Sequence, residues 1–151
     1  MFKAQTQIDV HNRRASIERI SKLSDNLIGI GPFGIGLDGI LAWIPGVGEL
    51  YSIGAGAALV AQGYRARVPA SVLAQAALLV SARTLSNVFP ILGGVVVDLF
   101  RGHRMAARML VRAIDETLYI EGEHSLEHPQ YADTLARIRS GQERRRVVFL
   151  G

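Results

Sequence analysis

The distribution of charged side chains changes abruptly along this 151-residue chain. Residues 5–28 place apolar side chains three or four positions apart, which is the spacing of one stripe on an amphipathic helix, while charged side chains occupy the other faces. The stripe consists of Ile17, Ile20, Leu23 and Leu27. Further on, the runs 50–64, 68–82 and 84–97 contain no charged side chain, and a polar turn at 65–69 separates the first two. The pattern predicts one water-facing helix followed by apolar helices.

The length of the uncharged runs limits how they can be used. A helix that crosses a bilayer needs roughly 20 predominantly apolar residues, and each of the three runs is shorter than that. Arginine side chains at the ends of a run can reach back to the membrane interface and lengthen the effective span. A core helix, a re-entrant helical hairpin or an interfacial segment therefore fits each run better than a simple crossing.

Two proline–glycine knuckles interrupt the apolar region. The first lies at residues 45–48, and a degraded copy follows 45 positions later at Pro90 and Gly93. Because proline ends or kinks a helix, each knuckle marks the point where two short apolar helices meet. The expected fold class is all-α, with two apolar helical hairpins related by a weak internal repeat. An N-terminal amphipathic helix and a short C-terminal helix from Pro129 to Ser140 would flank them.

Composition strengthens the apolar character of the chain. Hydrophobic residues make up 49% and charged residues 20%, whereas an average globular domain has about 25% charged residues. Small residues recur in the first uncharged run at Ser52, Gly56 and Gly63, with Gly54 and Ala58 alongside. This small-residue spacing lets helix backbones approach closely, so a helix–helix contact is expected there. With no cysteine, the chain has neither a disulfide framework nor a thiolate metal site.

The net charge of +4 comes mostly from arginine, and part of it forms a stripe on one helix. The stripe consists of Arg101, Arg104, Arg108 and Arg112. A polybasic helix next to an apolar hairpin predicts contact with anionic lipid headgroups, worth on the order of 1 kcal/mol per cation. The alternative is an ordinary solvated face, including His103, that forms salt bridges with the acidic segment 115–133. Nucleic acid is not an expected partner, because no aromatic side chains are interleaved with the arginines.

Two carboxylates, Asp38 and Glu49, bracket the first knuckle. They are candidates for an acid/base pair or a metal site, but each also falls in the first turn of an expected helix, where an acidic side chain suits the positive helix end. Neither histidine nor further carboxylates lie nearby to complete a metal site. The glycine-rich connector 29–36 matches neither a dinucleotide fingerprint nor a phosphate-binding P-loop. No metal, cofactor or enzymatic activity is therefore expected.

The stretch from Leu23 to Leu50 resembles an uncharacterised bacterial family, the domain of unknown function family DUF4112. The family pattern is a helix, an apolar Pro/Gly loop and G-L-D-x-L-L-G-L-I-P-G-V-G-D, followed about one helical hairpin later by I-P-x-x-G-D. The first copy matches at Gly36, Leu37, Asp38, Ile44, Pro45, Gly46, Val47 and Gly48, with Glu49 in place of the usual aspartate. The second copy matches at Pro90 and Gly93 but has Arg83 and Gly94 where the family has acidic residues.

The resemblance covers residues 15–112 and implies an all-helical, membrane-associated domain without catalytic activity. It divides the chain into a polar lead-in at 1–14, the helical domain at 15–112 and a charged C-terminal extension at 113–151. The motif residues that it singles out at the two knuckles are those named above. The second knuckle of this chain lacks the acidic residues of the family pattern, so a role that needs acidic residues at both knuckles is not expected.

Taken together, these features predict a non-catalytic membrane-associated protein with a structural, adaptor or oligomerising role. Its expected partners are membrane lipid and a second copy of the chain, at a bacterial inner membrane with both termini in the cytoplasm. The N-terminus lacks the apolar run of a secretory signal peptide. The alternative is a soluble helical bundle that buries the same runs in its own core and binds an apolar ligand or a protein partner. The shortness of the uncharged runs favours the soluble bundle, whereas the apolar connector and the low fraction of charged residues favour a membrane-associated protein.

Overall fold

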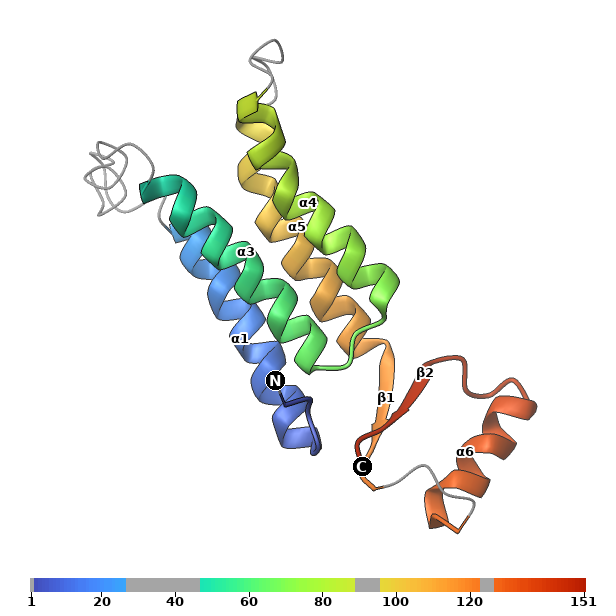
Figure 1. The fold of residues 1–151 in the computed structure, drawn as a ribbon. Helices are drawn as coiled ribbons and strands as arrows, with labels where there is room; N and C mark the ends of the chain where they lie inside the picture. Colours follow the sequence, from blue (N-terminus) through green and yellow to red (C-terminus); the bar gives the residue numbers. More distant parts are fainter. Residues whose placement is uncertain (1, 27–46, 89–95, 123–126) are drawn as a thin grey trace.

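The computed structural model describes residues 2–26, 47–88, 96–122 and 127–151. Four of its helices run alternately up and down and form a bundle (Figure 1). These are α1 (Gln7–Asn26), α3 (Val47–Arg65), α4 (Ala70–Val88) and α5 (Val96–Asp115). A small C-terminal unit follows, composed of β1 (Thr117–Ile120), α6 (Pro129–Arg139) and β2 (Arg146–Phe149). The described chain is mainly helical, which confirms the predicted all-α class.

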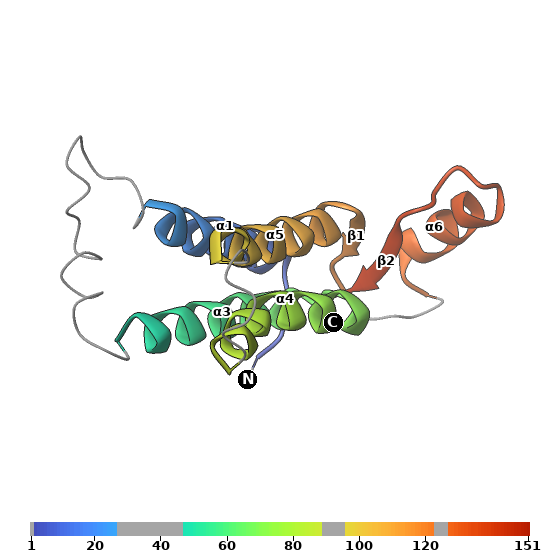
Figure 2. The same ribbon diagram turned by 90° about the horizontal axis from the view of Figure 1, so that it is seen from above.

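The bundle has two layers, which are separated clearly in Figure 2: α1 lies beside α5, and α3 lies beside α4. Helix α1 packs on α5 and α3, while α4 packs on α3 and α5. The core between the layers contains the fully buried side chains of Ile17, Leu59 and Leu110. Because each helix has two main neighbours, one side of every helix is left facing outward.

The uncharged runs are distributed over the helices unequally. The first run lies within α3 and the second largely within α4, whereas the third is divided between the end of α4 and the start of α5. Both predicted knuckle prolines, Pro45 and Pro90, lie outside the described residues. The predicted helix over 5–28 is confirmed as α1, and Ile17 of its apolar stripe is fully buried.

Helix α1 begins with a capping box. The hydroxyl of Thr6 accepts a hydrogen bond from the backbone N–H of Asp9 at 3.1 Å, and the Asp9 carboxylate accepts one from the backbone N–H of Thr6 at 3.2 Å. These bonds satisfy donors that the first turn of a helix leaves without intrahelical partners. Backbone donation from Gln5, together with that from Thr6, lowers the pKa of Asp9. The chain is thereby turned sharply at the point where α1 starts.

Glycines of α3 lie where helices approach one another closely. A Cβ at Gly56 would overlap Val80 Cγ1 of α4, and a Cβ at Gly63 would come within 2.7 Å of Leu110 Cδ2 of α5. By contrast, a Cβ at Gly54 would meet nothing within 4 Å. The expected helix–helix contact is therefore confirmed for Gly56 and Gly63, while Gly54 faces open space.

The C-terminal unit is a short parallel β-α-β arrangement. Strand β1 pairs with β2 in parallel register, with Thr117 opposite Arg146, and α6 connects the two strands. The short helix predicted from Pro129 is confirmed as α6. Strand β2 was not predicted, since its residues appear in the sequence only as an apolar tail after three arginines.

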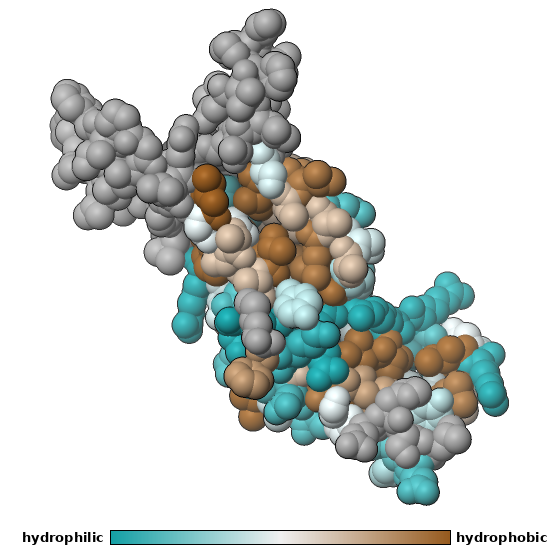
Figure 3. Space-filling model, in the orientation of Figure 1, coloured by the Kyte–Doolittle hydropathy of each residue, from teal (hydrophilic) through white to brown (hydrophobic). Residues whose placement is uncertain are grey.

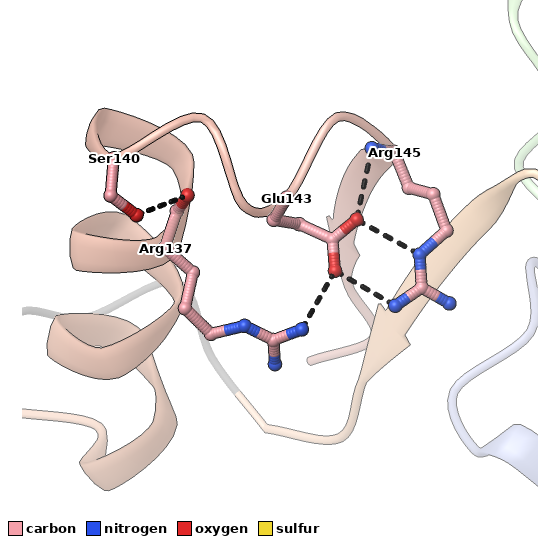
Figure 4. A network of polar contacts seen from close by, with 4 residues as sticks. All are labelled: Arg137, Ser140, Glu143 and Arg145. Atoms are coloured by element: carbon pink, nitrogen blue, oxygen red, sulfur yellow. Dashed lines mark hydrogen bonds and ion pairs between the residues drawn. The ribbon is translucent and has the colours of Figure 1, made fainter.

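Glu143 holds the connection between α6 and β2 together (Figure 4). Its carboxylate accepts hydrogen bonds from the side chain of Arg145 at 2.8 and 2.9 Å and from the backbone N–H of Arg145 at 3.0 Å. Arg137 of α6 donates another at 3.3 Å. The glutamate is only 6% exposed. Hydrogen bonds from Arg145, first from its side chain and then from its backbone, lower the pKa of Glu143 to about 2.

This lowered pKa predicts acid sensitivity of the C-terminal unit. Folding lowers the pKa of Glu143 from 4.5 to about 2. The ionised carboxylate therefore stabilises the folded C-terminal unit above pH 4.5, and this stabilisation is lost as the pH falls toward 2. The protection of amide hydrogens at residues 129–149, measured as their exchange rate relative to the unfolded chain at the same pH, is expected to fall over this range. Glu143→Gln should remove the pH dependence and show weak protection already at neutral pH. Unchanged protection between pH 4.5 and 2 in the wild type would contradict the assignment.

Candidate functional site

The outer face of the α3–α4 layer is an exposed apolar surface (Figure 3). In this view apolar residues gather over the upper part of the bundle, while hydrophilic residues cover much of its lower end and the C-terminal unit. Between residues 50 and 82 the charged side chains are Arg65 and Arg67, both at the turn that joins the two helices. Ile53 of α3 is 52% exposed and Leu78 of α4 is 70% exposed. Large apolar side chains therefore stand in water on a face without charge.

A groove runs between α3 and α4 on this face. Its volume is about 520 Å³, and the helices contribute small side chains where they come close, among them Gly56, Ala57 and Ala77. Larger apolar side chains, including Val60, Leu73 and Val80, also line the groove. Tyr64 lines it as well. Small residues on two facing helices leave space that larger residues would fill, which explains the hollow.

The predicted arginine stripe lies on the opposite layer of the bundle. Arg104, Arg108 and Arg112 are exposed and line a second groove, between α5 and α1, of about 600 Å³. Since one groove is lined by α3 and α4 and the other by α1 and α5, the two open on opposite faces (Figure 2). A flat bilayer can therefore contact one of these faces at a time.

Carboxylates share the α1–α5 groove with the arginines. Arg112 Nε lies 2.6 Å from Oε1 of Glu116, the residue directly after α5. Arg14 of α1 bridges Glu18 at 2.7 Å and Asp115 at 2.8 Å. The pairing with Glu116 agrees with the alternative in which the stripe forms salt bridges with the acidic segment. The groove is therefore of mixed charge.

His103 does not belong to the exposed basic face, so the prediction that it is solvated is wrong. The histidine is buried, and a Cβ added at Gly56 would lie 3.3 Å from its Nε2. On a helix, positions three, four and seven apart share one side. Ala106, Ala107 and Leu110 lie at these spacings from His103, and all three are buried. This apolar spacing was visible in the sequence and would have placed the histidine on the packed side.

Several predicted site residues lie outside the described part of the chain. These are Gly36, Asp38, Pro45, Gly46, Pro90 and Gly93. Gly48 and Glu49 fall within the first turn of α3, and Arg101 falls within α5. Whether Asp38 and Glu49 approach one another stays a sequence-based prediction.

Arg67 connects the bundle to both ends of the chain, a role that the sequence analysis missed. Its guanidinium donates hydrogen bonds to the carbonyl oxygens of Ala4 at 3.0 Å, Phe149 at 2.9 Å and Leu150 at 3.1 Å. In return, Arg146 donates to the backbone oxygen of Arg67 at 2.7 Å. The acceptors are 63 to 83 residues away in sequence, so no local pattern indicates the contact.

In the part of the chain that the structure describes, the fold and this surface define a bundle of four helices with an apolar outer layer and an appended β-α-β unit. The chain belongs to the family described as "Domain of unknown function (DUF4112)", whose model matches residues 13–114. This match confirms the resemblance and covers nearly the whole bundle. Neither the curated proteins nor the solved structures contain a significant match to the chain. Within the described ranges, no helix combines the length and the apolar character needed to cross a bilayer.

Proposed function

We propose that the protein is a non-catalytic, membrane-associated protein that rests on a bilayer with the outer face of its α3–α4 layer against the lipid. One observation carries the proposal: Ile53, which lines the α3–α4 groove, and Leu78 of α4 are both more than half exposed, on helices whose residues 50–64 and 70–82 carry no charged side chain. Exposed apolar surface of this kind is typical of protein or membrane contact sites. Removing it from water is favourable by about 25 cal/mol per Å².

The proposed orientation places the two layers in different surroundings. Helices α3 and α4 would lie in the plane of the interface, as helices of surface-bound proteins do, while the charged α1–α5 layer would face water. We place the protein at the cytoplasmic side of a bacterial inner membrane, in a structural, adaptor or oligomerising role. In this orientation the arginine stripe points away from the lipid. Binding of headgroups by Arg104 and Arg108 would instead require the α1–α5 face to contact the bilayer, which is the competing orientation.

Vesicle flotation with matched variants tests the proposal. Ile53→Asp places a charge on the α3–α4 face, whereas Met105→Asp places the same charge on α5 at a residue of equal exposure, 50% against 52%. We expect Ile53→Asp to reduce vesicle binding at least tenfold, because an ionised carboxylate must be desolvated on contact with lipid. Met105→Asp is expected to leave binding unchanged.

Two results would contradict the proposed orientation. Wild-type protein that stays monomeric and ignores vesicles of any composition would exclude membrane association. Equal loss of binding in both aspartate variants, or loss only when Arg104 and Arg108 are replaced by glutamine, would favour the α1–α5 face instead. Circular dichroism of each variant shows whether the helices are intact.

The groove between α3 and α4 supports a second candidate function, the binding of an apolar ligand. Its volume of about 520 Å³ falls within the usual range of small-molecule sites, about 300–1,000 Å³. Native mass spectrometry of protein purified without detergent should then show a bound apolar molecule. Ala77→Phe, which fills the groove, should remove that molecule without abolishing vesicle flotation.

A further inference from the structure

The N-terminal arm, residues 2–6, extends from the α1 side of the bundle to the outer side of the α3–α4 layer (Figure 2). Ala4 fixes the arm in this position, since the residue is buried and both its backbone N–H and its carbonyl oxygen form hydrogen bonds. Its N–H donates to the carbonyl oxygen of Arg65 at 2.7 Å, and its own carbonyl accepts from Arg67 Nε at 3.0 Å. The two residues before Ala4 are therefore held beside the end of α3.

The side chains held there are of the types found at membrane interfaces. Phe2 is 89% exposed. The ammonium group of Lys3 lies 5.2 Å from the centroid of the Tyr64 ring, and Tyr64 itself lines the α3–α4 groove. The ammonium group and the phenol thus meet at the rim of the apolar face, and Phe2 directly precedes Lys3 in the arm. Moving an exposed phenyl ring out of water is favourable, so Phe2 would be stabilised by contact with an apolar surface.

We propose that Phe2, Lys3 and Tyr64 form an interfacial anchor that recognises anionic phospholipid. Phe2 would insert among the acyl chains, and Tyr64 would lie at the headgroup level, where tyrosine is enriched in membrane proteins. Lys3 would bind lipid phosphate, with its aliphatic stem along apolar surface and its ammonium group in the headgroup layer. This inference rests on the proposed function and adds the lipid class and the residues that select it.

The geometry supports lipid over a protein groove as the occupant. The rim joins directly to the uncharged α3–α4 face through Tyr64, so one flat surface can contact the anchor and the face together. The ammonium group of Lys3 places a positive charge at this rim. An anionic, planar partner matches both the shape and the charge of this arrangement.

The full chain allows a direct test, because it contains no cysteine. A single cysteine introduced as Phe2→Cys and labelled with an environment-sensitive fluorophore should show a blue-shifted emission on mixing with phosphatidylcholine–phosphatidylglycerol vesicles. The same label at Met105→Cys, on the opposite layer, should remain in water. In flotation of unlabelled protein, Phe2→Ser should weaken binding about tenfold. Lys3→Gln should weaken it about fivefold on phosphatidylglycerol vesicles only.

The outcomes separate this proposal from the proposed function. Vesicle binding that depends on Ile53 but leaves the label at position 2 in water, with Phe2→Ser and Lys3→Gln binding normally, would overturn the anchor and leave membrane association in place. A blue shift caused by self-association without vesicles would also overturn it, in favour of a second copy as the partner. Absence of any vesicle binding by the wild type would overturn both proposals.

Discussion

Gly56→Ala is expected to destabilise the bundle by about 1–3 kcal/mol, the usual cost of adding a methyl group to a closely packed contact. The added Cβ would overlap Val80 Cγ1, and it would also lie 3.2 Å from Val80 Cβ, so a change of side-chain rotamer alone cannot relieve the clash. Helices α3 and α4 would have to move apart. In a domain of this size, each kcal/mol lowers the melting temperature by about 2–4 °C, which thermal unfolding followed by circular dichroism can measure.

Two other glycines of the same helix provide matched controls. Gly54→Ala adds the same methyl group where nothing lies within 4 Å, so it should stabilise the helix by about 0.8–1 kcal/mol through propensity alone. Gly63→Ala should fall between the two, because its nearest neighbours are the ends of the leucine side chains of Leu110 and Leu73 at 2.7 and 3.0 Å. Equal melting temperatures for the three variants would contradict the packing of α3 against α4.

Arg67→Ala is expected to release the C-terminal strand from the bundle. Three carbonyl oxygens would lose a charged donor, and a single hydrogen bond to a charged group is worth about 1.5–3 kcal/mol. Amide exchange at residues 146–150 should accelerate first, since Phe149 and Leu150 supply two of the acceptors. Urea unfolding measures the effect on the whole protein.

Comparison with Arg67→Gly separates the side chain from the backbone. Arg67 has a φ of 58°, a left-handed conformation that costs a residue other than glycine roughly 1–2 kcal/mol. Both variants lose the guanidinium, but only glycine removes the backbone strain. Glycine also makes the unfolded chain more flexible, which offsets part of this gain. Arg67→Gly should therefore be less destabilising than Arg67→Ala by about 1 kcal/mol. Identical exchange at β2 in wild type and both variants would show that the guanidinium does not hold the strand.

These contacts also bear on the proposed membrane role. Arg67 holds Ala4, and Ala4 positions the arm that carries Phe2 and Lys3. The same guanidinium holds Phe149 and Leu150. Arg67 thus connects the N-terminal arm to the C-terminal unit, which lies outside the residues that the family model matches.

The local pattern of side chains was sufficient to predict the helices. The three- and four-residue spacing around Ile17 identified α1, the uncharged runs identified α3 and α4, and Pro129 marked the start of α6. Each of these signals operates within a few turns of one element, since helix formation depends on backbone propensity and on which side of the helix is apolar. The family motif was also recognisable at this level, because it is a contiguous stretch of residues.

The candidate surface, in contrast, depends on how the helices pair. The sequence placed an arginine stripe next to apolar hairpins, but it could not show that the stripe and the uncharged face point in opposite directions. The strand β2 and the three carbonyls bound by Arg67 were missed for the same reason. Such contacts join residues that are dozens of positions apart, and they become favourable only once the core has brought their elements together. Helix formation was therefore predictable from the chain, whereas the tertiary packing decided which faces meet and which are left for a partner.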